Sequence, residues 1–598
     1  MNKHKKYKKI IAACLSIGII CSMSSFIGFY NNNKITIKAA EKADWLTTKG
    51  NKIVDMDGNE VWLTGVNWFG FNTQRRTFDG LWSSNLRDNL KLIADHGMNL
   101  LRIPMAAEQL LDWKAGKPYK LTWEFNKWKN SEFVGNFDPD SENPNENAAI
   151  MPTDLDTFNI ALQLCKEMGI KVMVDIHSDE VDDNGHQRAV WWTDKISTAQ
   201  YYEALEWLAD TYKNDDTIIA IDLKNEPHGK KTDAVMAKWD DSTDENNWQN
   251  VASVAGKKVL AKNPNLLIMV EGVEVYPKEG FDYTATAGGY GQPENYYGTW
   301  WGGNFRGAKE YPVDLGDKQD QLVYSPHDYG PSVWAQSWFE KDFTTETLYE
   351  DCWGPNWMYL MEDGDKNGNT YPLLIGEWGG FVIGDSDERA ESQKDIVKNT
   401  KWLSLLQEYI IENKIHHTFW CFNYNSSDTG GLMWDDFQQW NEPKYQFLKP
   451  ALWTAEDTNK YAGKFVGLDH DIPLGANGIT LSQYYENSGG PSVTTTPALT
   501  STTTSVTATV SSSSSTVSNT SSSQNPDSKI GDIDLDNQVG KIADVVLLGK
   551  HVASKITLTG QSLINANCDT RDAAINVADL QALIKFMLKQ VSVLPFTG

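Results

Sequence analysis

The chain has little of the chemistry on which several classes of protein depend. Only 6 of its 598 residues are cysteine, and those after residue 40 stand far apart: Cys165, Cys352, Cys421 and Cys568. Such spacing excludes a disulfide framework and a zinc ribbon. Basic residues are also scarce, since 54 Lys and Arg face 80 Asp and Glu and leave a net charge of −26. A phosphate backbone needs a clustered basic surface, so nucleic acid is excluded as a partner.

Long apolar runs are scarce as well. The one near the N-terminus, from Ile10 to about Phe29, follows a lysine-rich stretch. This layout predicts a secretory signal peptide over residues 1–40, with a retained membrane anchor as the alternative. No other segment is apolar enough to span a bilayer. We therefore expect a secreted, extracellular protein without membrane contact in its mature form.

Residues 487–528 consist almost entirely of Thr, Ser, Val and Pro. This composition offers too little apolar surface to offset the entropy of chain ordering, so the segment is predicted to be a linker. It separates a body, residues 41–486, from a tail, residues 529–592. The length of the chain fits this division into more than one domain.

In the body, short apolar runs rich in β-branched residues alternate with amphipathic stretches. The runs cover residues 61–67, 99–104, 170–177, 218–225, 266–272, 322–329, 373–378 and 417–423. Helical patterns cover residues 85–96, 155–168, 199–212, 248–261 and 392–412. Eight strand and helix units predict a (β/α)8 TIM barrel of the α/β class. Polar, Trp-rich segments at 106–153 and 277–321 are expected to be long loops that build a cleft.

Two glutamates follow apolar runs in matching positions. Glu226 ends the fourth predicted strand in Asn-Glu-Pro, and Glu377 ends the seventh. Catalytic residues of TIM barrels gather at the carboxyl ends of the strands, and strands four and seven face each other across the mouth. Glycoside hydrolysis needs one carboxyl group that is protonated and one that is ionised, about 5 to 5.5 Å apart for retention. A lone glutamate could equally cap a helix or pair with an arginine, but the matched pair favours catalysis.

Other polar and aromatic residues end the neighbouring strands. Arg102 ends the second strand, and a cation beside Glu377 would favour its ionised form. The remaining strand ends carry His177, His327, Tyr329 and Trp420. Each alone could be core packing or an ordinary ion pair. Together they predict one shared site.

At this point the body resembles the cellulases of glycoside hydrolase family 5. The likeness covers residues 43 to about 453. It rests on the stretches TGVNWFG at 64–70, NEPH at 225–228, PNLLIMVEG at 264–272, WWGGN at 300–304, HDY at 327–329 and SDTGG at 427–431. The resemblance implies that Glu226 protonates the leaving oxygen and later activates water, while Glu377 forms the glycosyl-enzyme. It also implies that Arg102 and Tyr329 position Glu377.

The resemblance implies a set of substrate contacts around this pair and no cofactor or metal in catalysis. Asn225 would bond the sugar 2-hydroxyl, His177 and His327 would line the same subsite, and Trp420 would be its stacking floor. Further stacking platforms are expected at Trp68, Trp192 and Trp301.

The tail repeats itself with a period of about 35 residues, around Asp544 and Asp579, which predicts two similar halves. Ahead of the first repeat, Asp532, Asp534 and Asp536 alternate in the manner of oxygen ligands for Ca²⁺. The second loop offers Asn567 and Asp569, with Arg571 at the third alternating position. The candidate ligands are Asp532, Asp534, Asp536, Asp544, Asn567, Asp569 and Asp579. The tail resembles a dockerin, a small all-α domain, which implies calcium and docking to the cohesin module of a cellulosome scaffoldin. A two-helix cap with acidic loops is the alternative. The terminal LPFTG at 594–598, a sortase-like pattern, is read as chance.

The leading hypothesis is a secreted endo-β-1,4-glucanase that cleaves internal bonds of cellulose with retention, and whose partner is a β-glucan polysaccharide. A β-mannanase or xyloglucanase on the same fold remains open, because the residues at the cleavage centre do not separate them. An inactive carbohydrate-binding scaffold component and a structural cell-surface adhesin are the alternatives from other classes. The sequence leaves open the endo or processive mode.

Overall fold

The computed structural model describes residues 43–142, 148–286 and 295–454, and parts of the tail between 529 and 595. The predicted signal peptide, linker and end of the body, residues 455–486, lie outside the described residues. Within the described ranges, no helix combines the length and the apolar character needed to cross a membrane.

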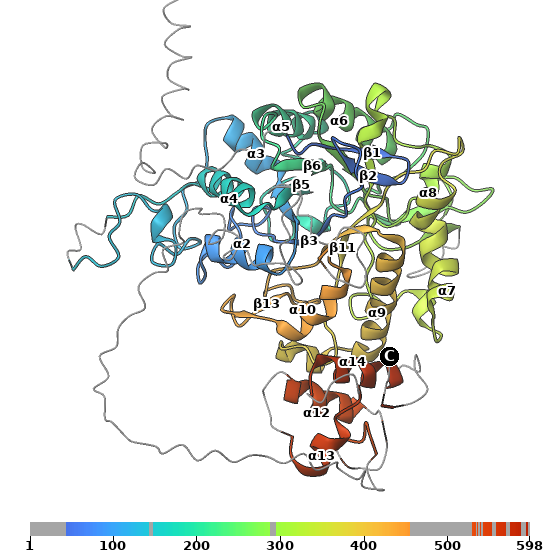
Figure 1. Cartoon of the computed structure of the whole chain (residues 1–598). Helices are drawn as coiled ribbons and strands as arrows, with labels where there is room; N and C mark the ends of the chain where they lie inside the picture. The colour runs from blue at the N-terminus through green and yellow to red at the C-terminus, as the bar shows by residue number, and fades with distance from the viewer. Residues whose placement is uncertain are drawn as a thin grey trace, which may run out of the picture. The chain divides into compact units, whose positions relative to one another are not determined.

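Eight parallel strands form one sheet, as predicted (Figure 1). They are β3 (Thr64–Asn67), β4 (Leu100–Ala106), β5 (Lys171–Ser178), β6 (Ile218–Asp222), β7 (Leu267–Val270), β10 (Leu322–Tyr324), β11 (Leu374–Trp378) and β12 (His416–Phe419). Neighbours in the chain are neighbours in the sheet, and β12 pairs back to β3. The parallel bridges from Tyr324 to Leu373 and from His327 to Glu377 join β10 to β11 and close the barrel.

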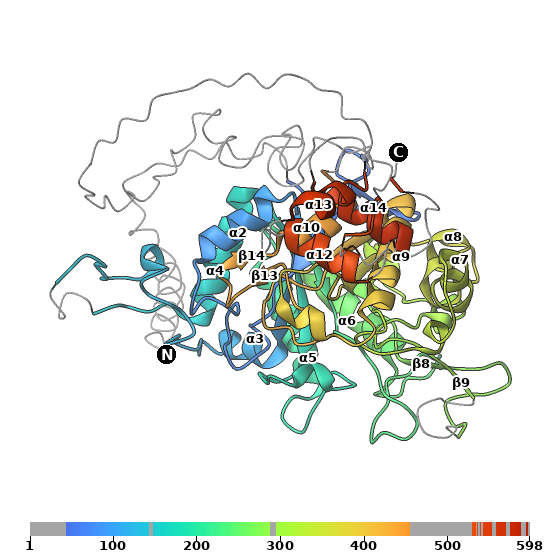
Figure 2. The same cartoon turned by 90° about the horizontal axis from the view of Figure 1, so that it is seen from below.

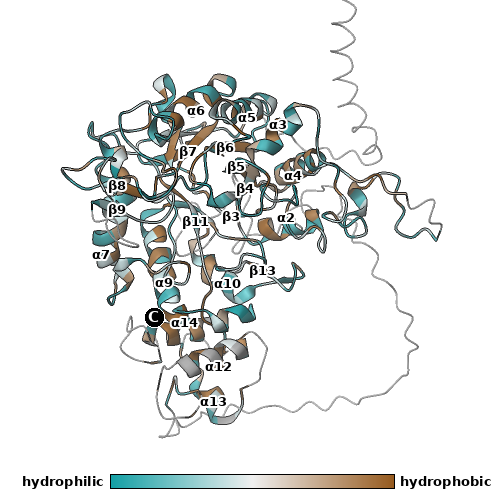
Figure 3. Cartoon of the chain, turned by 180° about the vertical axis from the view of Figure 1, so that it is seen from behind, coloured by the Kyte–Doolittle hydropathy of each residue, from teal (hydrophilic) through white to brown (hydrophobic). Residues whose placement is uncertain are grey.

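The strands are buried along their whole length, which is why they read as continuous apolar runs. Every residue of β4, β5, β6 and β7 is buried. Helices cover the outside of a parallel barrel and side chains fill its inside, so neither face of a strand meets water. Figure 3 shows β6 and β7 in the brown of apolar residues.

The helices that cover the strands begin and end where polar residues predict them to. They are α2 (Leu86–Asp95), α4 (Asp154–Met168), α5 (Thr198–Thr211), α6 (Trp248–Lys262) and α9 (Ile396–Asn413), and they surround the strands in Figures 1 and 2. Thr153 and Asp156 form a capping box at the start of α4, and Gly169, at φ +71°, ends it. Ser197 and Gln200 cap α5 in the same way. The predicted helices are confirmed.

Several elements were not predicted. The expected loop at 106–153 contains a helix, α3 (Ala107–Lys114), and the loop at 277–321 begins in a hairpin of β8 (Val275–Pro277) and β9 (Tyr296–Gly298). After β10 come α7 (Thr345–Leu348), a π-helix (Tyr349–Met358) that contains a proline, and α8 (Tyr359–Glu362). After β12 come the hairpin β13 (Met433–Trp434) and β14 (Gln439–Trp440) and then α10 (Glu442–Leu448).

A further hairpin, β1 (Leu46–Lys49) and β2 (Lys52–Asp55), lies at the amino end of the barrel. Leu46 and Ile53 are buried in one cluster with Leu63, Leu100 and other residues near the starts of the strands. The hairpin therefore closes that end. Access to the barrel is left to the carboxyl end, where the predicted site residues lie.

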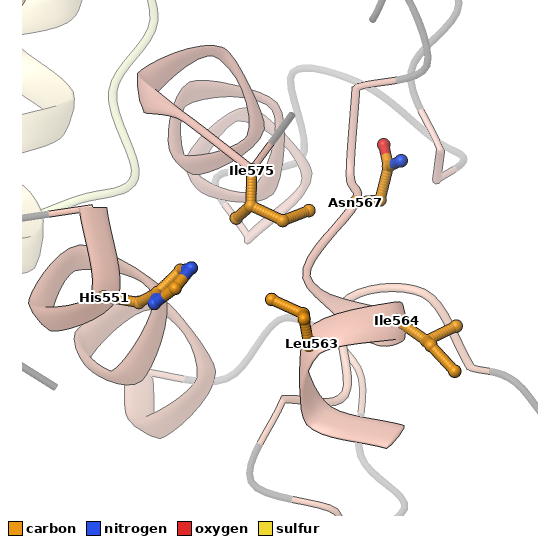
Figure 4. A pocket seen from close by; sticks show the side chains of 5 residues that line it. All are labelled: His551, Leu563, Ile564, Asn567 and Ile575. Atoms are coloured by element: carbon orange, nitrogen blue, oxygen red, sulfur yellow. The ribbon is translucent and has the colours of Figure 1, made fainter. Parts of the chain in front are cut away.

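Among its described residues the tail has the helices α12 (Ile542–Val552), α13 (Gly560–Asn565) and α14 (Val577–Met587). An open cavity of about 470 Å³ lies between them, lined by His551, Leu563, Ile564, Asn567 and Ile575 (Figure 4). Its lining is mostly apolar, and Ile564 is 52% exposed.

Candidate active site

A buried arginine organises the mouth of the barrel. Arg102, on β4, is completely buried and donates from Nη1 to Glu377 Oε1 at 2.8 Å. Its Nη2 lies 3.0 Å from Asp222, 3.1 Å from Glu271 and 3.2 Å from Asp175. Burial disfavours the guanidinium charge, but the surrounding carboxylates outweigh burial and raise the pKa of Arg102 well above its usual value. The arginine is thus a fixed positive charge that ties β4 to carboxylates from β5, β6, β11 and the end of β7.

Glu377, at the end of β11, is held in its ionised form. Oε1 accepts the hydrogen bond from Arg102, and Oε2 accepts one from the Tyr329 hydroxyl at 2.7 Å. Burial alone would raise the pKa of Glu377, but the positive charges of His327 and Arg102 outweigh it, and the pKa lies below its usual value. The result is a buried carboxylate, 4% exposed, with both oxygens oriented.

Glu226, which follows β6, lies in an environment that favours its protonated form. Burial raises its pKa, and the negative charge of Glu377 adds to this although a hydrogen bond with His327 opposes it. The backbone of Glu226 is left-handed, with φ +49°, and its N–H donates to Glu271 Oε2 at 2.7 Å. A non-glycine residue rarely adopts this conformation, so the contact with Glu271 fixes the direction of the side chain.

The two glutamates face each other. One carboxylate oxygen of Glu226 and one of Glu377 lie within 4.8 Å of each other. His327 lies beside both, with Nδ1 at 3.0 Å from Glu226 Oε1 and 3.7 Å from Glu377 Oε2. Two carboxyl groups at this separation, one favouring the proton and one favouring the charge, have the arrangement required for acid and nucleophile.

His327 carries positive charge into the space between the carboxyl groups. Its Nε2 lies 3.1 Å from Glu271 Oε1. Burial would lower the pKa of His327, but Glu271 and Glu377 raise it well above the usual value. Glu226, His327 and Glu377 also offer ligand atoms close enough together to hold a cation. Both oxygens of Glu377 already accept hydrogen bonds, one from Arg102 and one from Tyr329.

Three acidic residues of this network were missed in the sequence: Asp175, Asp222 and Glu271. All are completely buried, on or just after β5, β6 and β7. Burial raises the pKa of Asp175 to about 7 and that of Asp222 to about 6, against the opposing charge of Arg102. Each is a single acidic residue within an apolar run. This pattern was a signal in the sequence, because a buried carboxylate needs a buried partner.

Asn225 and His177 lie in the same network. Asn225 Oδ1 accepts a hydrogen bond from Arg102 Nη2 at 3.1 Å, which directs its NH₂ group away from the arginine. His177 Nδ1 is 2.6 Å from Asp175 Oδ2, and burial lowers the pKa of His177 well below its usual value. His177 is therefore neutral, with Nδ1 oriented by Asp175.

Aromatic rings line two sides of the mouth. Trp420 is half-buried and lies parallel to His177, with ring centres 5.7 Å apart and planes at 4°, and nearly parallel to Phe69 at 5.5 Å and 14°. On the other side, Trp301 stacks on His228 at 3.8 Å and 6°. Phe69 is half-buried and was not predicted. These rings offer flat apolar faces next to the carboxyl pair.

Two further tryptophans were predicted as platforms. Trp192 is half-buried against the edge of Trp191. Trp68 is completely buried, packed against Phe78 and Phe422, with its indole N–H donated to Asp79 O at 2.9 Å. The prediction for Trp68 is wrong, because its ring presents no face to a ligand.

The predicted calcium ligands of the tail are only partly described. Asp534 and Asp536 lie outside the described residues. Asp544 and Asp579, at the starts of α12 and α14, accept backbone hydrogen bonds from Ile533 at 2.6 Å and from Asp569 at 2.9 Å. The two repeats thus use their aspartates alike, each in the first turn of its helix.

The family model described as cellulase (glycosyl hydrolase family 5) matches residues 54–426. The chain is 45% identical to endoglucanase G of Acetivibrio thermocellus over 522 residues, which are 83% of this chain and 85% of the relative. It is 43% identical to endoglucanase B of the same organism, over 75% of this chain and 78% of the relative. A solved complex of an endocellulase from Pyrococcus horikoshii with cellotetraose is similar with a TM-score of 0.54 and 27% identity, over 69% of this chain and 99% of that one.

Proposed function

Since the chain belongs to glycosyl hydrolase family 5, the cellulases, we propose that it is an endo-β-1,4-glucanase that cleaves internal bonds of cellulose with retention of configuration. Glu226 is the acid and base, and Glu377 is the nucleophile. The observation that carries the proposal is the approach of the two carboxylates to within 4.8 Å in opposite electrostatic environments. Inverting enzymes keep their carboxyl groups about 6.5 to 9.5 Å apart to admit a water molecule between acid and base.

In the first step Glu226 donates its proton to the glycosidic oxygen while Glu377 attacks the anomeric carbon. The glycosidic C–O bond breaks, and an ester between Glu377 and the sugar forms. Arg102 and Tyr329 keep the attacking carboxylate ionised and oriented, as their hydrogen bonds of 2.8 and 2.7 Å indicate. Asn225, anchored to Arg102, directs its NH₂ group toward the sugar 2-hydroxyl.

In the second step Glu226, now ionised, takes a proton from water as the water attacks the anomeric carbon. The ester breaks, and both glutamates return to their first state. His327, hydrogen-bonded to Glu226, stabilises the charge that this residue carries between the steps. No cofactor takes part.

The substrate is proposed to be a β-glucan polymer. Trp420, Phe69 and His177 form one wall of parallel rings, and the Trp301 and His228 pair forms another. Such faces pack against the apolar faces of sugar rings. Binding on both sides of the carboxyl pair favours cleavage within a chain.

Product analysis on carboxymethylcellulose, mannan and xyloglucan tests this specificity. We expect cello-oligosaccharides from carboxymethylcellulose and a slower reaction with the other two. Faster cleavage of mannan or xyloglucan would replace the assignment by that of a mannanase or xyloglucanase. Glu377→Ala should lower the rate by several orders of magnitude. Unchanged hydrolysis in this variant would overturn the two-glutamate mechanism, and binding without hydrolysis in the wild type would make the barrel a binding module.

For the remainder of the chain we propose a signal peptide over 1–40, a catalytic domain over 41–486, a linker over 487–528 and a dockerin over 529–592. The enzyme is then secreted and held on a cellulosome scaffold through a cohesin. The open apolar cavity of the tail, with Leu563 and Ile564 37% and 52% exposed, supports a protein partner (Figure 4). Capture by immobilised cohesins in the presence of Ca²⁺ would support docking, and failure with every cohesin tested would refute it.

Calcium in the tail fits its donor set. Asp532, Asp544, Asp569 and Asp579 are at most 4% exposed and place four carboxyl groups in the two repeats. The buried Oδ1 of Asn567 has no hydrogen-bond partner among the described residues. Oxygen donors of this kind suit Ca²⁺. Calorimetric titration should detect binding, and a heat-capacity scan unaffected by Ca²⁺ or EGTA would contradict it.

A further inference from the structure

Exposed aromatic side chains are concentrated in one segment of the barrel. Among the described residues, five aromatic side chains are strongly exposed, and three of them lie between residues 115 and 142: Tyr119, Trp123 and Trp128. Trp123 is 64% exposed. By contrast, ten tryptophans of the chain are almost completely buried. Figure 1 shows this segment extending outward beside α2 and α4.

Trp123 does not stand alone. Its ring centre lies 6.4 Å from that of Trp82, which is half-buried in the connection between β3 and α2. Phe437, in the turn of the β13 and β14 hairpin, packs edge-on beneath Trp82 at 5.7 Å. Single exposed apolar residues are common and need no explanation, whereas a supported pair of indole rings does. We call Trp82 and Trp123, with Phe437 beneath them, the outer platform.

The backbone on which Trp123 stands is rigid. Buried Glu124 accepts hydrogen bonds from the Thr122 N–H at 2.8 Å, the Thr122 hydroxyl at 2.9 Å and the Tyr119 hydroxyl at 3.1 Å. Asn126, two residues after Glu124, donates from its backbone N–H to Leu81 O at 2.8 Å and from its side-chain NH₂ group to Trp82 O at 2.9 Å. The two loops are therefore joined, and the backbone that carries Trp123 is ordered before a ligand binds.

Trp82 is fixed from the other side as well. Its indole N–H donates to Asp436 Oδ1 at 2.9 Å, and the Ser83 hydroxyl donates to Asp436 O at 2.7 Å. Asp435, Asp436 and Phe437 are all left-handed, with φ of +50°, +52° and +62°. Three consecutive non-glycine residues in this conformation are unfavourable and persist only where the surroundings hold them, which is common at ligand-binding sites.

The outer platform is continuous with the mouth of the barrel. Its three parts belong to the connections that follow β3, β4 and β12, which are adjacent strands. Phe69 and Trp420, which line the mouth, follow two of the same strands. Asn425 links them to the platform, because its side chain donates to Asp79 at 2.7 Å, three residues before Trp82.

We propose that the outer platform is a binding site for a β-glucan chain that extends out of the mouth past Trp420 and Phe69. The ligand is a neutral polysaccharide, since the platform offers flat indole faces, with the Asp436 carboxylate at the edge of Trp82. The proposal rests on the proposed β-glucanase activity. Only a glucan chain long enough to extend out of the mouth reaches the outer platform. The platform therefore contributes to binding of the polymer and not to cleavage of the glycosidic bond.

The test compares polymer with short substrate. Trp123→Ala in the full-length enzyme should weaken binding to insoluble cellulose, and slow its hydrolysis, by about 5-fold, the loss expected for one aromatic contact. The kcat/KM for cellotetraose should stay within about twofold of the wild-type value. Trp123→Tyr should restore most of the polymer binding. Trp82→Phe, which keeps the ring but loses the hydrogen bond to Asp436, should give an intermediate effect. Met56, in the turn after β2, is 55% exposed. Met56→Ala is the matched control and should not change the binding or hydrolysis of either substrate.

Other outcomes separate the possible failures. If Trp123→Ala binds and degrades cellulose like the wild type, the outer platform is not a binding site. If the variant loses activity equally on cellotetraose, the loop acts through the catalytic centre and the proposal is again wrong. If the wild type cleaves neither cellulose nor cellotetraose, the proposed function fails. Comparing how tightly the wild type and Trp123→Ala bind cellulose then still tests whether the outer platform is a binding site.

Discussion

Removal of one hydroxyl group should change the pH dependence of the enzyme. Tyr329 donates to Glu377 Oε2 at 2.7 Å, a short bond to a charged acceptor in a buried site. Hydrogen bonds to charged groups contribute about 1.5 to 3 kcal/mol. In Tyr329→Phe the ring keeps its edge-on contact with Trp300, at 6.2 Å, while the bond is lost. The substitution therefore removes the stabilisation of the carboxylate and little of the packing.

The sign follows from the charge states. In the proposed mechanism, catalysis needs Glu377 ionised and Glu226 protonated. The acid limb of kcat/KM then reports the lowered pKa of Glu377, and the alkaline limb reports the raised pKa of Glu226. Without the Tyr329 bond the carboxylate of Glu377 is less stable and its pKa rises. We expect the acid limb to move to higher pH by about 1 to 2 units, since 1.36 kcal/mol corresponds to one unit.

The assay is the pH profile of kcat/KM on a soluble cello-oligosaccharide. Tyr324→Phe is the matched control, because Tyr324 is buried on β10 and its hydroxyl accepts from Val313 N at 3.1 Å, away from the glutamates. Its acid limb should match that of the wild type. An acid limb that stays in place in Tyr329→Phe would refute the assignment of Glu377 as the ionised group that limits activity at low pH.

Three further predictions concern the surroundings of the pair. Glu271→Gln removes the carboxyl group that lies 3.1 Å from His327 and raises the pKa of that imidazole. The positive charge on His327, which lowers the pKa of Glu377, then becomes less stable. The acid limb should therefore move to higher pH and kcat should fall about 10-fold or more, measured by pH profiles with cellulose derivatives. Gly302→Ala would place a methyl carbon 2.3 Å from Glu271 Oε2 at a position with φ +71°, so kcat should fall with little change in KM in steady-state kinetics. Trp68→Ala should lower the free energy of unfolding by about 3 to 5 kcal/mol in urea titrations. Trp420→Ala should change the free energy of unfolding by no more than about 1 kcal/mol but should raise KM. The reverse result would contradict the placement of these two rings.

The barrel was predictable from the sequence because its strands are buried on both faces and separated by amphipathic helices. The helix α3 was not, since its eight residues, Ala107–Lys114, introduce a long polar segment rich in tryptophan. The helical region after β10 was hidden by Gly354 and Pro355, which interrupt any regular pattern in a π-helix.

The site was predictable where polar residues end strands. Arg102, Glu226 and Glu377 stand out there because nothing else in the pattern explains a charge after an apolar run. Phe69 was missed because a phenylalanine after a strand looks like core, and Trp68 was misread for the opposite reason. Adjacent residues of a chain point to opposite sides, so the sequence alone does not say which of the two rings faces the mouth.

The central claim is a double displacement in which Glu377 attacks the sugar and Glu226 serves as acid and then base. Proton NMR of the first products released from a soluble cello-oligosaccharide tests it most directly, because it records the configuration at the new reducing end before mutarotation. The account predicts the β-anomer as the initial product. Initial release of the α-anomer would show a single displacement by water and would contradict the assignment of Glu377 as the nucleophile.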